Sequence, residues 1–166
     1  MSYVAIPLDA AFKKDGFSCG KAALDIYIQK QVSQDIKRKL ALCFVIIENK
    51  IIKGYYTLSN NSIPQEQVPD EIRKKLPKSY TGIPTTLLGR LAVDEKFKGQ
   101  GIGETLLLDA LKRSYDVSKS SIASMAIIVD PIDEEAVSFY KKYGFIKLPD
   151  SCKMFIAMKT VGNLFD

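Results

Sequence analysis

The sequence of 166 residues contains no histidine, no tryptophan and only three cysteines. Without histidine the chain cannot build a Ser-His or Cys-His nucleophile pair, nor use an imidazole as a general base. Cys19, Cys43 and Cys152 are odd in number and form no CxxC pair, which argues against a disulfide framework. We expect Cys19 and Cys152 to be packing residues. Scattered cysteines and no histidine offer little to zinc, so no metal site is expected.

Long apolar runs are also missing. The longest, 40–47, is too short to cross a bilayer. Residues 1–6 lack the basic start and the apolar stretch of a secretory signal. These features predict a cytoplasmic protein with no membrane partner, and the length suits a single domain over 1–166.

Basic residues exceed acidic ones by 24 to 19, giving a net charge of +5 and a pI near 9.0. A polyanionic partner, either a cofactor phosphate or a nucleic acid, fits this balance. The basic side chains cluster at Lys37-Arg38-Lys39, at Arg73-Lys74-Lys75 with Lys78, and at Lys141-Lys142. Such clusters either form a solvated face or bind phosphates, and the residues alone leave both interpretations open.

Hydrophobic periodicity predicts strands that alternate with helices, which gives an α/β fold with a mixed sheet. We expect helices over 20–39, 102–115 and 133–143, and strands over 2–7, 41–47, 51–59, 85–93, 122–129 and 153–159. Residues 48–50 should form a tight turn between two strands. The prolines of 62–84 interrupt regular structure there and leave room only for a short helix over 69–76.

The strongest local signal is a glycine-rich turn between a strand and a helix, Lys98-Gly99-Gln100-Gly101-Ile102-Gly103. Consecutive amides at a helix N-terminus form a concave set of donors, to which the helix dipole adds positive potential. The spacing matches neither a Walker A loop nor a dinucleotide fingerprint. The turn therefore predicts a pyrophosphate site, and the alternative is a strand-to-helix connection without a ligand.

Two motifs together resemble the GNAT N-acetyltransferases. The turn at 98–103 is similar to that family's acetyl-CoA signature, Arg/Gln-x-x-Gly-x-Gly/Ala, and residues 133–145 are similar to its second motif, Asn-x-x-Ala-x-x-x-Tyr with a Gly-Phe close. The motifs have the family's order and separation. The resemblance implies the GNAT fold, a mixed central sheet with splayed parallel strands flanked by helices, and acetyl-CoA as cosubstrate.

Three further segments, 17–25, 54–59 and 87–94, resemble one branch of that family, the GNAT toxins of bacterial toxin–antitoxin pairs. This resemblance covers roughly residues 3–160. It implies acetylation of the α-amino group of aminoacyl-tRNA, which blocks translation. It also implies an antitoxin partner with a ribbon-helix-helix part, and often a homodimer.

The resemblance also implies roles for individual residues. Backbone groups of Leu91, Ala92 and Val93 would pair with the pantetheine arm, and residues Lys98, Gly99, Gln100, Gly101, Ile102 and Gly103 would hold the pyrophosphate. Tyr140 aligns with the general acid that protonates the departing thiolate; the alternative is a core aromatic, which is the expectation for Tyr143. Arg73, Lys74, Lys75 and Arg90 are candidates for contacts with tRNA.

This sequence departs from the family pattern at two positions. Lys98 replaces the usual arginine, so that a bidentate contact becomes a point charge. Asp133 stands where many members carry an asparagine, and an ionised aspartate cannot donate a hydrogen bond, so we leave it out of the site.

Three functions remain open at this point. The first is a toxin that acetylates aminoacyl-tRNA. The second is a GNAT enzyme for a small amine or a protein N-terminus, and the third is a non-catalytic CoA-binding module. The absence of histidine favours an α-amine as acceptor, because its pKa of about 7.7–8.0 requires no strong base, unlike the pKa of about 10.4 of a lysine side chain.

Overall fold

The structure is a computed structural model that describes residues 3–166. Its strands are β1 (Ile6–Pro7), β2 (Leu42–Glu48), β3 (Ile51–Pro64), β4 (Gly82–Val93), β5 (Ala126–Val129), β6 (Ile146–Lys147) and β7 (Met154–Ala157). Its α-helices are α1 (Ala22–Ile26), α2 (Val32–Lys37), α3 (Asp70–Arg73), α4 (Ile102–Ser120), α5 (Glu134–Lys142) and α6 (Met158–Phe165). Between them lie the π-helical turn η1 (Tyr27–Gln31) and the 3₁₀ turns η2 (Gln65–Gln67) and η3 (Glu95–Phe97).

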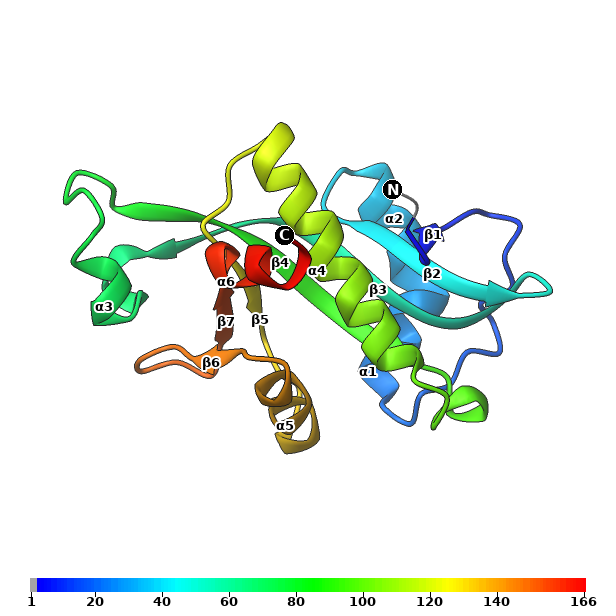
Figure 1. The fold of residues 1–166 in the computed structure, drawn as a ribbon. Helices are drawn as coiled ribbons and strands as arrows, with labels where there is room; N and C mark the ends of the chain where they lie inside the picture. Colours follow the sequence, from blue (N-terminus) through cyan, green and yellow to red (C-terminus); the bar gives the residue numbers. More distant parts are fainter. Residues whose placement is uncertain (1–2) are drawn as a thin grey trace. The chain divides into compact units, whose positions relative to one another are not determined.

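Hydrogen bonds link the strands in the order β1-β2-β3-β4-β5-β7-β6 (Figure 1). The β4–β5 pair is parallel, whereas the β1–β2, β2–β3, β5–β7 and β6–β7 pairs are antiparallel. The predicted α/β fold with a mixed sheet is therefore confirmed. The parallel register covers Thr85–Leu87 and Ala126–Ile128 only, although β4 continues to Val93.

The described chain forms two compact units, each with its own apolar core. The first unit comprises Met1–Ser59 and Leu88–Arg113, and the second comprises Asn60–Leu87 and Ser114–Asp166. A single domain over 1–166 stays a prediction. No helix in residues 3–166 combines the length and the apolar character needed to span a membrane.

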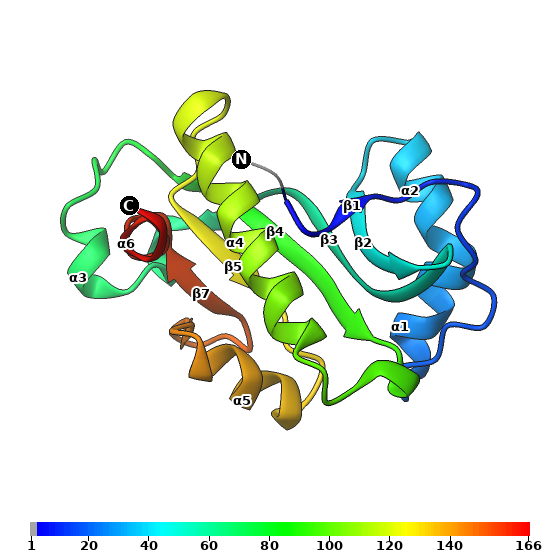
Figure 2. The same ribbon diagram turned by 45° about the vertical axis from the view of Figure 1, so that its right-hand side comes forward.

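In the first unit, α1, η1 and α2 cover one face of β2 and β3, and the first part of α4 lies on the other face (Figures 1 and 2). Strand periodicity explains this arrangement, because successive side chains point to opposite faces. Cys43 and Val45 belong to the core beneath the first helices. Phe44, between them, instead stacks on Tyr56 with ring centroids 5.3 Å apart.

The tight turn predicted at 48–50 is confirmed. Asn49 and Lys50 have φ values of 52° and 63°, and β2 and β3 pair on either side of them. A two-residue hairpin turn with both residues in the left-handed region matches the twist of the flanking strands.

In the second unit, a core forms around β5, with side chains from β3, β4 and β7 and from the connection between β3 and β4. That connection is shorter than predicted, because β3 extends to Pro64 and β4 starts at Gly82. Gln65 closes it: its side-chain amide donates to the carbonyls of Pro77 and Tyr80, at 2.9 and 2.8 Å. Side-chain hydrogen bonds thus replace the strand pairing that the prolines prevent.

Several further boundaries differ from the prediction. The helix expected over 102–115 continues to Ser120, and the strand expected over 122–129 starts only at Ala126. The last strand ends at Ala157 and is followed by α6, which was not predicted. Helix α6 packs closely, since a Cβ on Gly162 would lie 2.8 Å from the Tyr115 ring. The expected first strand is reduced to Ile6–Pro7, and residue 2 lies outside the described residues.

Candidate functional site

The glycine-rich turn has the backbone conformation that its sequence predicts. Gly99 and Gly101 have φ values of 82° and 76°, a region that residues with a side chain rarely adopt. The backbone conformation therefore favours glycine at both positions. A Cβ at either position would meet no atom within 4 Å, so open space lies beside the turn. Helix α4 begins directly afterwards, at Ile102, and the first amides of a helix have no partner within it. The turn can therefore present backbone N–H groups to an anion.

The start of α4 rests on β3 through a close contact at Gly54. A Cβ on Gly54 would lie 2.8 Å from Leu106 Cδ1, 3.0 Å from the Ala92 carbonyl oxygen and 3.2 Å from Ile102 Cγ2. Glycine in a strand often marks such an approach of a second element. Gly54 thus allows the start of α4 to lie close against the sheet.

Residues 17–20, which we call the tie segment, are linked to the first helix and to the chain around this turn by hydrogen bonds that the main-chain atoms of residues 17–19 make, mostly with side chains. On the side of the glycine turn, the Ser18 N–H donates to Asp94 Oδ2 at 3.2 Å, and the Ser18 carbonyl accepts from the Glu95 N–H at 2.8 Å. The Lys98 ammonium donates to the Cys19 carbonyl at 3.0 Å. The predicted cofactor residue Lys98 therefore already holds a partner within the protein.

The helix side holds the same segment by two other bonds. The Gln29 side-chain amide donates to the Phe17 carbonyl at 2.7 Å, and Asp25 Oδ1 accepts from the Cys19 N–H at 2.8 Å. Phe17 is thus bonded to η1, Ser18 to the chain before the glycine turn, and Cys19 to both α1 and Lys98.

Asp94 is the residue at this site that the sequence analysis missed. Its side chain is almost fully buried, with 2% exposed, and accepts hydrogen bonds from the backbone of Lys96 at 2.9 Å and of Ser18 at 3.2 Å. The first bond is an N-cap of η3, which an aspartate at the end of a strand could have indicated. The second joins residues far apart in the sequence and leaves no local signal.

The cysteines fall into two groups. Burial raises the pKa of Cys19 to about 11, with a further contribution from its hydrogen bond with Asp25, and burial raises the pKa of Cys43 to about 12. Both thiols thus stay protonated at neutral pH, and Cys19 packs as expected. The expectation for Cys152 was wrong, because its side chain is exposed. The connection before β7 places it at the surface.

Arg90 lies on β4 with its guanidinium carbon 3.6 Å from the centroid of the Tyr27 ring. Tyr27 opens the π-helical turn within the helix predicted over 20–39, and its hydroxyl donates to Asp35 Oδ2 at 2.9 Å. Among residues 3–166, no carboxylate forms an ion pair with Arg90. The stacked guanidinium therefore keeps its N–H donors for another acceptor.

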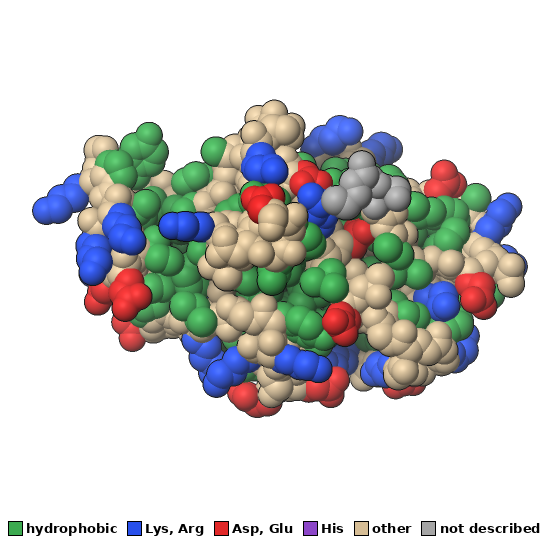
Figure 3. All heavy atoms as spheres, in the orientation of Figure 1, with side chains coloured by type: hydrophobic (Ala, Val, Ile, Leu, Met, Phe, Trp, Pro, Cys, Tyr) green, Lys and Arg blue, Asp and Glu red, His purple; other side chains and the backbone are tan. Residues whose placement is uncertain are grey.

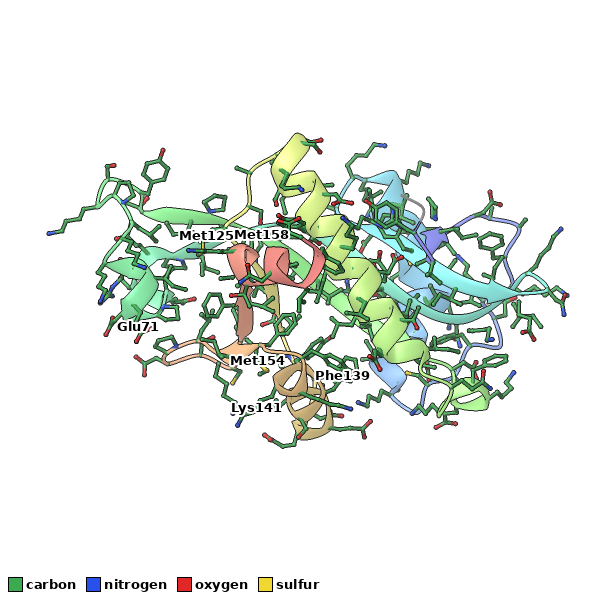
Figure 4. All side chains as sticks on the ribbon, viewed as in Figure 1. Glu71, Met125, Phe139, Lys141, Met154 and Met158 are labelled. Carbon is green, nitrogen blue, oxygen red and sulfur yellow. The ribbon has the colours of Figure 1, made fainter. Side chains whose placement is uncertain are left out.

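Tyr140 lies in α5, where aromatic rings surround it. The centroids of Phe139 and Phe145 are each 5.3 Å from its own, and only 7% of Tyr140 is exposed. Burial raises the pKa of its phenol above the ordinary value, so the group stays protonated across the physiological range. Figure 4 shows that Lys141 leaves α5 on the outer side, away from Phe139.

Both ends of α5 are capped. Asp133 Oδ1 accepts from the Ala136 N–H at 2.9 Å, so this carboxylate serves the helix start. At the other end Gly144 has a φ of 99°, and the Phe145 N–H donates to the Tyr140 carbonyl at 3.2 Å, which forms a Schellman cap. The caps fix the register of Tyr140 on its helix.

The basic residues proposed for tRNA follow α3 in the second unit. Arg73 pairs with Asp70 at 2.7 Å on the exposed face of the short helix, and Lys74 and Lys75 extend into solvent. Figure 3 shows basic side chains gathered over this part of the chain. This surface is positively charged, and the side chains that form it make few contacts with the rest of the protein.

The structure thus divides the predicted site residues between the two units. Leu91, Ala92 and Val93 end β4 in the first unit, which also holds Arg90 and the turn 98–103; Ala92 is buried and its two neighbours are half-buried. Tyr140 and the residues Arg73, Lys74 and Lys75 belong to the second unit. Within residues 3–166, no cluster of three potential metal ligands occurs.

Comparison with known proteins identifies the family. Residues 9–154 match the acetyltransferase (GNAT) domain. The tRNA-acetylating toxin of Mycobacterium tuberculosis is 33% identical over 144 residues, which cover 86% of this chain and 84% of the toxin.

Two solved structures of the toxin AtaT are similar in fold. AtaT complexed with acetyl-methionyl-tRNAfMet has a TM-score of 0.89 and 29% identity, with 98% of each chain covered. An AtaT mutant bound to acetyl-CoA and to the C-terminus of the antitoxin AtaR has a TM-score of 0.81 and 26% identity, with 97% and 96% covered. The chain therefore belongs to the GNAT acetyltransferase family.

Proposed function

We propose that this protein transfers the acetyl group of acetyl-CoA to the α-amino group of an aminoacyl-tRNA and acts as a toxin. The observation that carries the proposal is the turn at Gly99–Gly103, where two left-handed glycines precede a 19-residue helix and face open space. Backbone amides at such a helix start suit a pyrophosphate. Backbone groups of Lys98, Gly99, Gln100, Gly101, Ile102 and Gly103 would hold the phosphates, and those of Leu91, Ala92 and Val93 the pantetheine arm.

The reaction then requires one attack and two proton movements. The acceptor amine nitrogen bonds to the carbonyl carbon of the thioester as the carbon–sulfur bond breaks. Tyr140 would donate its phenolic proton to the departing thiolate, and the attacking nitrogen would lose a proton to water. Solvent would then return a proton to the Tyr140 phenolate, which completes the cycle. Since the phenol is the weaker acid, the donation depends on positioning, which the capped helix and the neighbouring rings supply.

Charged tRNA as the acceptor is supported by three independent features. A relative that is 33% identical is a tRNA-acetylating toxin, and a similar structure contains acetyl-methionyl-tRNA. The chain lacks histidine, and an α-amine needs no strong base. The exposed positive charge of Arg73, Lys74 and Lys75 suits a phosphate backbone.

Arg90 is our candidate for a contact near the acceptor end of the tRNA. Its guanidinium carbon lies over the Tyr27 ring, 3.6 Å from the centroid, and its N–H groups have no carboxylate partner among the described residues. A planar guanidinium held in this way can bind a phosphate through two donors or stack on an unpaired base.

The proposal includes the partners that the resemblance implies. An antitoxin would restrain the enzyme, as suggested by the relative that was solved with the C-terminus of AtaR. We further propose that the antitoxin has a ribbon-helix-helix part, that the toxin forms a homodimer, that it needs no metal, and that it acts in the cytoplasm, where charged tRNA is found.

Labelled acetyl-CoA incubated with total charged tRNA tests this function. We expect label in aminoacyl-tRNA, none in deacylated tRNA, and its loss after base hydrolysis of the ester. Expression without an antitoxin should arrest growth, and Tyr140→Phe should relieve the arrest. Faster acetylation of spermidine, free amino acids or a protein N-terminus, together with harmless expression, would replace the toxin by a general GNAT enzyme.

A further inference from the structure

Lys98 stands at the first position of the family pattern, where arginine is usual, and although the residue is exposed its ammonium donates to a carbonyl of the protein itself. Its ammonium lies 3.0 Å from the carbonyl oxygen of Cys19, a buried residue of the tie segment. A main-chain carbonyl that accepts from an ammonium gains a charge-assisted hydrogen bond. Lys98 therefore links the residue just before Gly99 to a fixed point of the backbone.

Asp94 makes the matching connection four residues earlier. Its buried carboxylate accepts from the Ser18 N–H, and the next residue, Glu95, donates its own N–H to the Ser18 carbonyl. The chain between the end of β4 and the glycine turn is thus attached to the tie segment at Asp94, Glu95 and Lys98. A turn that binds through backbone amides needs such support, because its binding groups are the backbone itself.

The tie segment is in turn immobilised from the helix side. Gln29 and Asp25, on η1 and α1, bond the Phe17 carbonyl and the Cys19 N–H. Gly20 has a φ of 90°, and a Cβ there would lie 2.5 Å from a Glu95 carboxylate oxygen. The positive φ favours glycine at this position, and the carboxylate of Glu95 lies directly beside it.

We infer that Lys98 and Asp94 are positioning residues, which hold the amides of the glycine turn in place through the tie segment, and that Lys98 does not act as a cation on the pyrophosphate. This inference rests on the proposed use of acetyl-CoA. It separates two roles that the sequence motif combines: the backbone of 99–103 binds the pyrophosphate, and the Lys98 side chain holds that backbone in place.

The test compares Lys98→Met with Lys96→Met. Lys96 is exposed and lies two residues away, so both variants lose one positive charge near the turn. For Lys98→Met without ligand we expect faster amide hydrogen exchange in residues 17–20. The KM for acetyl-CoA should rise about tenfold, the size of a lost hydrogen bond to a charged group, while kcat stays within about twofold. Lys98→Arg should restore KM, and Lys96→Met should resemble the wild type.

The salt dependence of acetyl-CoA binding separates bracing from direct contact. A brace leaves the slope of log Kd against log salt unchanged in Lys98→Met, because no phosphate contact is lost. Unchanged exchange in 17–20 together with a shallower slope would overturn the inference. A wild-type protein that does not bind acetyl-CoA would refute the proposed function, and the exchange measurement would still report on the brace. Should Lys98→Met not fold, Lys98→Gln retains a donor and loses the charge: a brace then predicts a KM close to that of the wild type, and a cation that contacts the pyrophosphate predicts a raised KM.

Discussion

The glycine turn and the surroundings of Tyr140 are built in different ways. The turn is attached by polar bonds to main-chain atoms, from Asp94, Glu95 and Lys98. Tyr140 is held by ring contacts with Phe139 and Phe145 and by a capped helix. The difference follows from the groups that we propose each region uses, which are backbone amides in the turn and a side-chain hydroxyl at Tyr140. A site made of backbone amides is fixed by bonding the backbone, whereas a side-chain donor is fixed by packing around its ring.

The basic segment at 73–75 provides the contrasting case within the second unit. The ion pair of Arg73 with Asp70 is exposed, and such pairs contribute about 0–1 kcal/mol. Long-range attraction to phosphates does not require exact geometry, so little structure is needed there. The three elements thus suit the three tasks that we propose for them: binding a small anion, donating a proton and attracting a polyanion.

The largest effect is expected from Gly101→Glu. The substitution puts a side chain at a φ of 76° and a carboxylate beside the proposed phosphates. Acetyl-CoA at about one hundred times its Kd should stabilise the wild type by about 2.7 kcal/mol, and this stabilisation should disappear in the variant. Thermal melts with and without acetyl-CoA measure it, with Gly16→Glu as control because a Cβ on Gly16 also meets no atom within 4 Å. A full melting shift in Gly101→Glu would show that the turn does not bind the cosubstrate.

The second effect removes a single oxygen. Tyr140→Phe should lower kcat by about 10²-fold or more, the scale of a lost general acid, and leave the Kd for acetyl-CoA nearly unchanged. The matched control is Tyr143→Phe on the same helix, which should keep kcat within about twofold. Because burial raises the pKa of Tyr140, the wild-type rate should rise as the acceptor amine deprotonates and should not fall again below about pH 10. Wild-type turnover by Tyr140→Phe would make the tyrosine a packing residue.

These elements differ in how far the sequence predicted them. The helix over 20–39 was recognisable because Ile28 and Val32 repeat at helical spacing, and both are fully buried. Its π-helical turn at Tyr27–Gln31 was not, since one extra residue per turn hardly changes that pattern. The glycines at 99 and 101 were recognisable because few other residues adopt their conformation.

The bonds that brace the turn could not have been predicted. Ser18 and Asp94 are 76 positions apart, and neither the hydrogen bond between them nor that from Lys98 to Cys19 produces a periodic pattern. Helix α6 was missed for a related reason. It is only eight residues long, and its fit depends on Gly162 meeting the ring of Tyr115, which is a tertiary contact. Figure 4 places Met125 and Met158 together where α6 begins, and the Met158 N–H donates to the Met125 carbonyl at 2.8 Å.

A smaller effect is expected when the charge of the basic segment is reversed. The triple variant Arg73→Glu, Lys74→Glu and Lys75→Glu should lower the rate of tRNA acetylation about tenfold at low salt and make its salt dependence shallower. Acetyl-CoA binding should not change. The same charge reversal at Lys37, Arg38 and Lys39 separates a local contact from a general loss of positive charge. Equal losses in both variants would mean that only net charge matters, and no loss in either would leave both clusters as solvated surface.

The smallest effect concerns the thiols, and it reports on the tie segment directly. Since the pKa values of Cys19 and Cys43 are raised to about 11 and about 12, little thiolate exists at pH 8, and both side chains are buried. An aromatic disulfide reagent should therefore label Cys152 rapidly, with one equivalent of reagent per chain, whereas Cys19 and Cys43 should react only after unfolding.

In a Cys152→Ser background, the slow labelling of Cys19 measures opening of residues 17–20. Acetyl-CoA should slow that labelling severalfold, because the occupied turn and the tie segment are bonded to each other, whereas Cys43 should respond less. Fast labelling of Cys19 in the folded protein, unaffected by acetyl-CoA, would show that the segment opens independently of the turn.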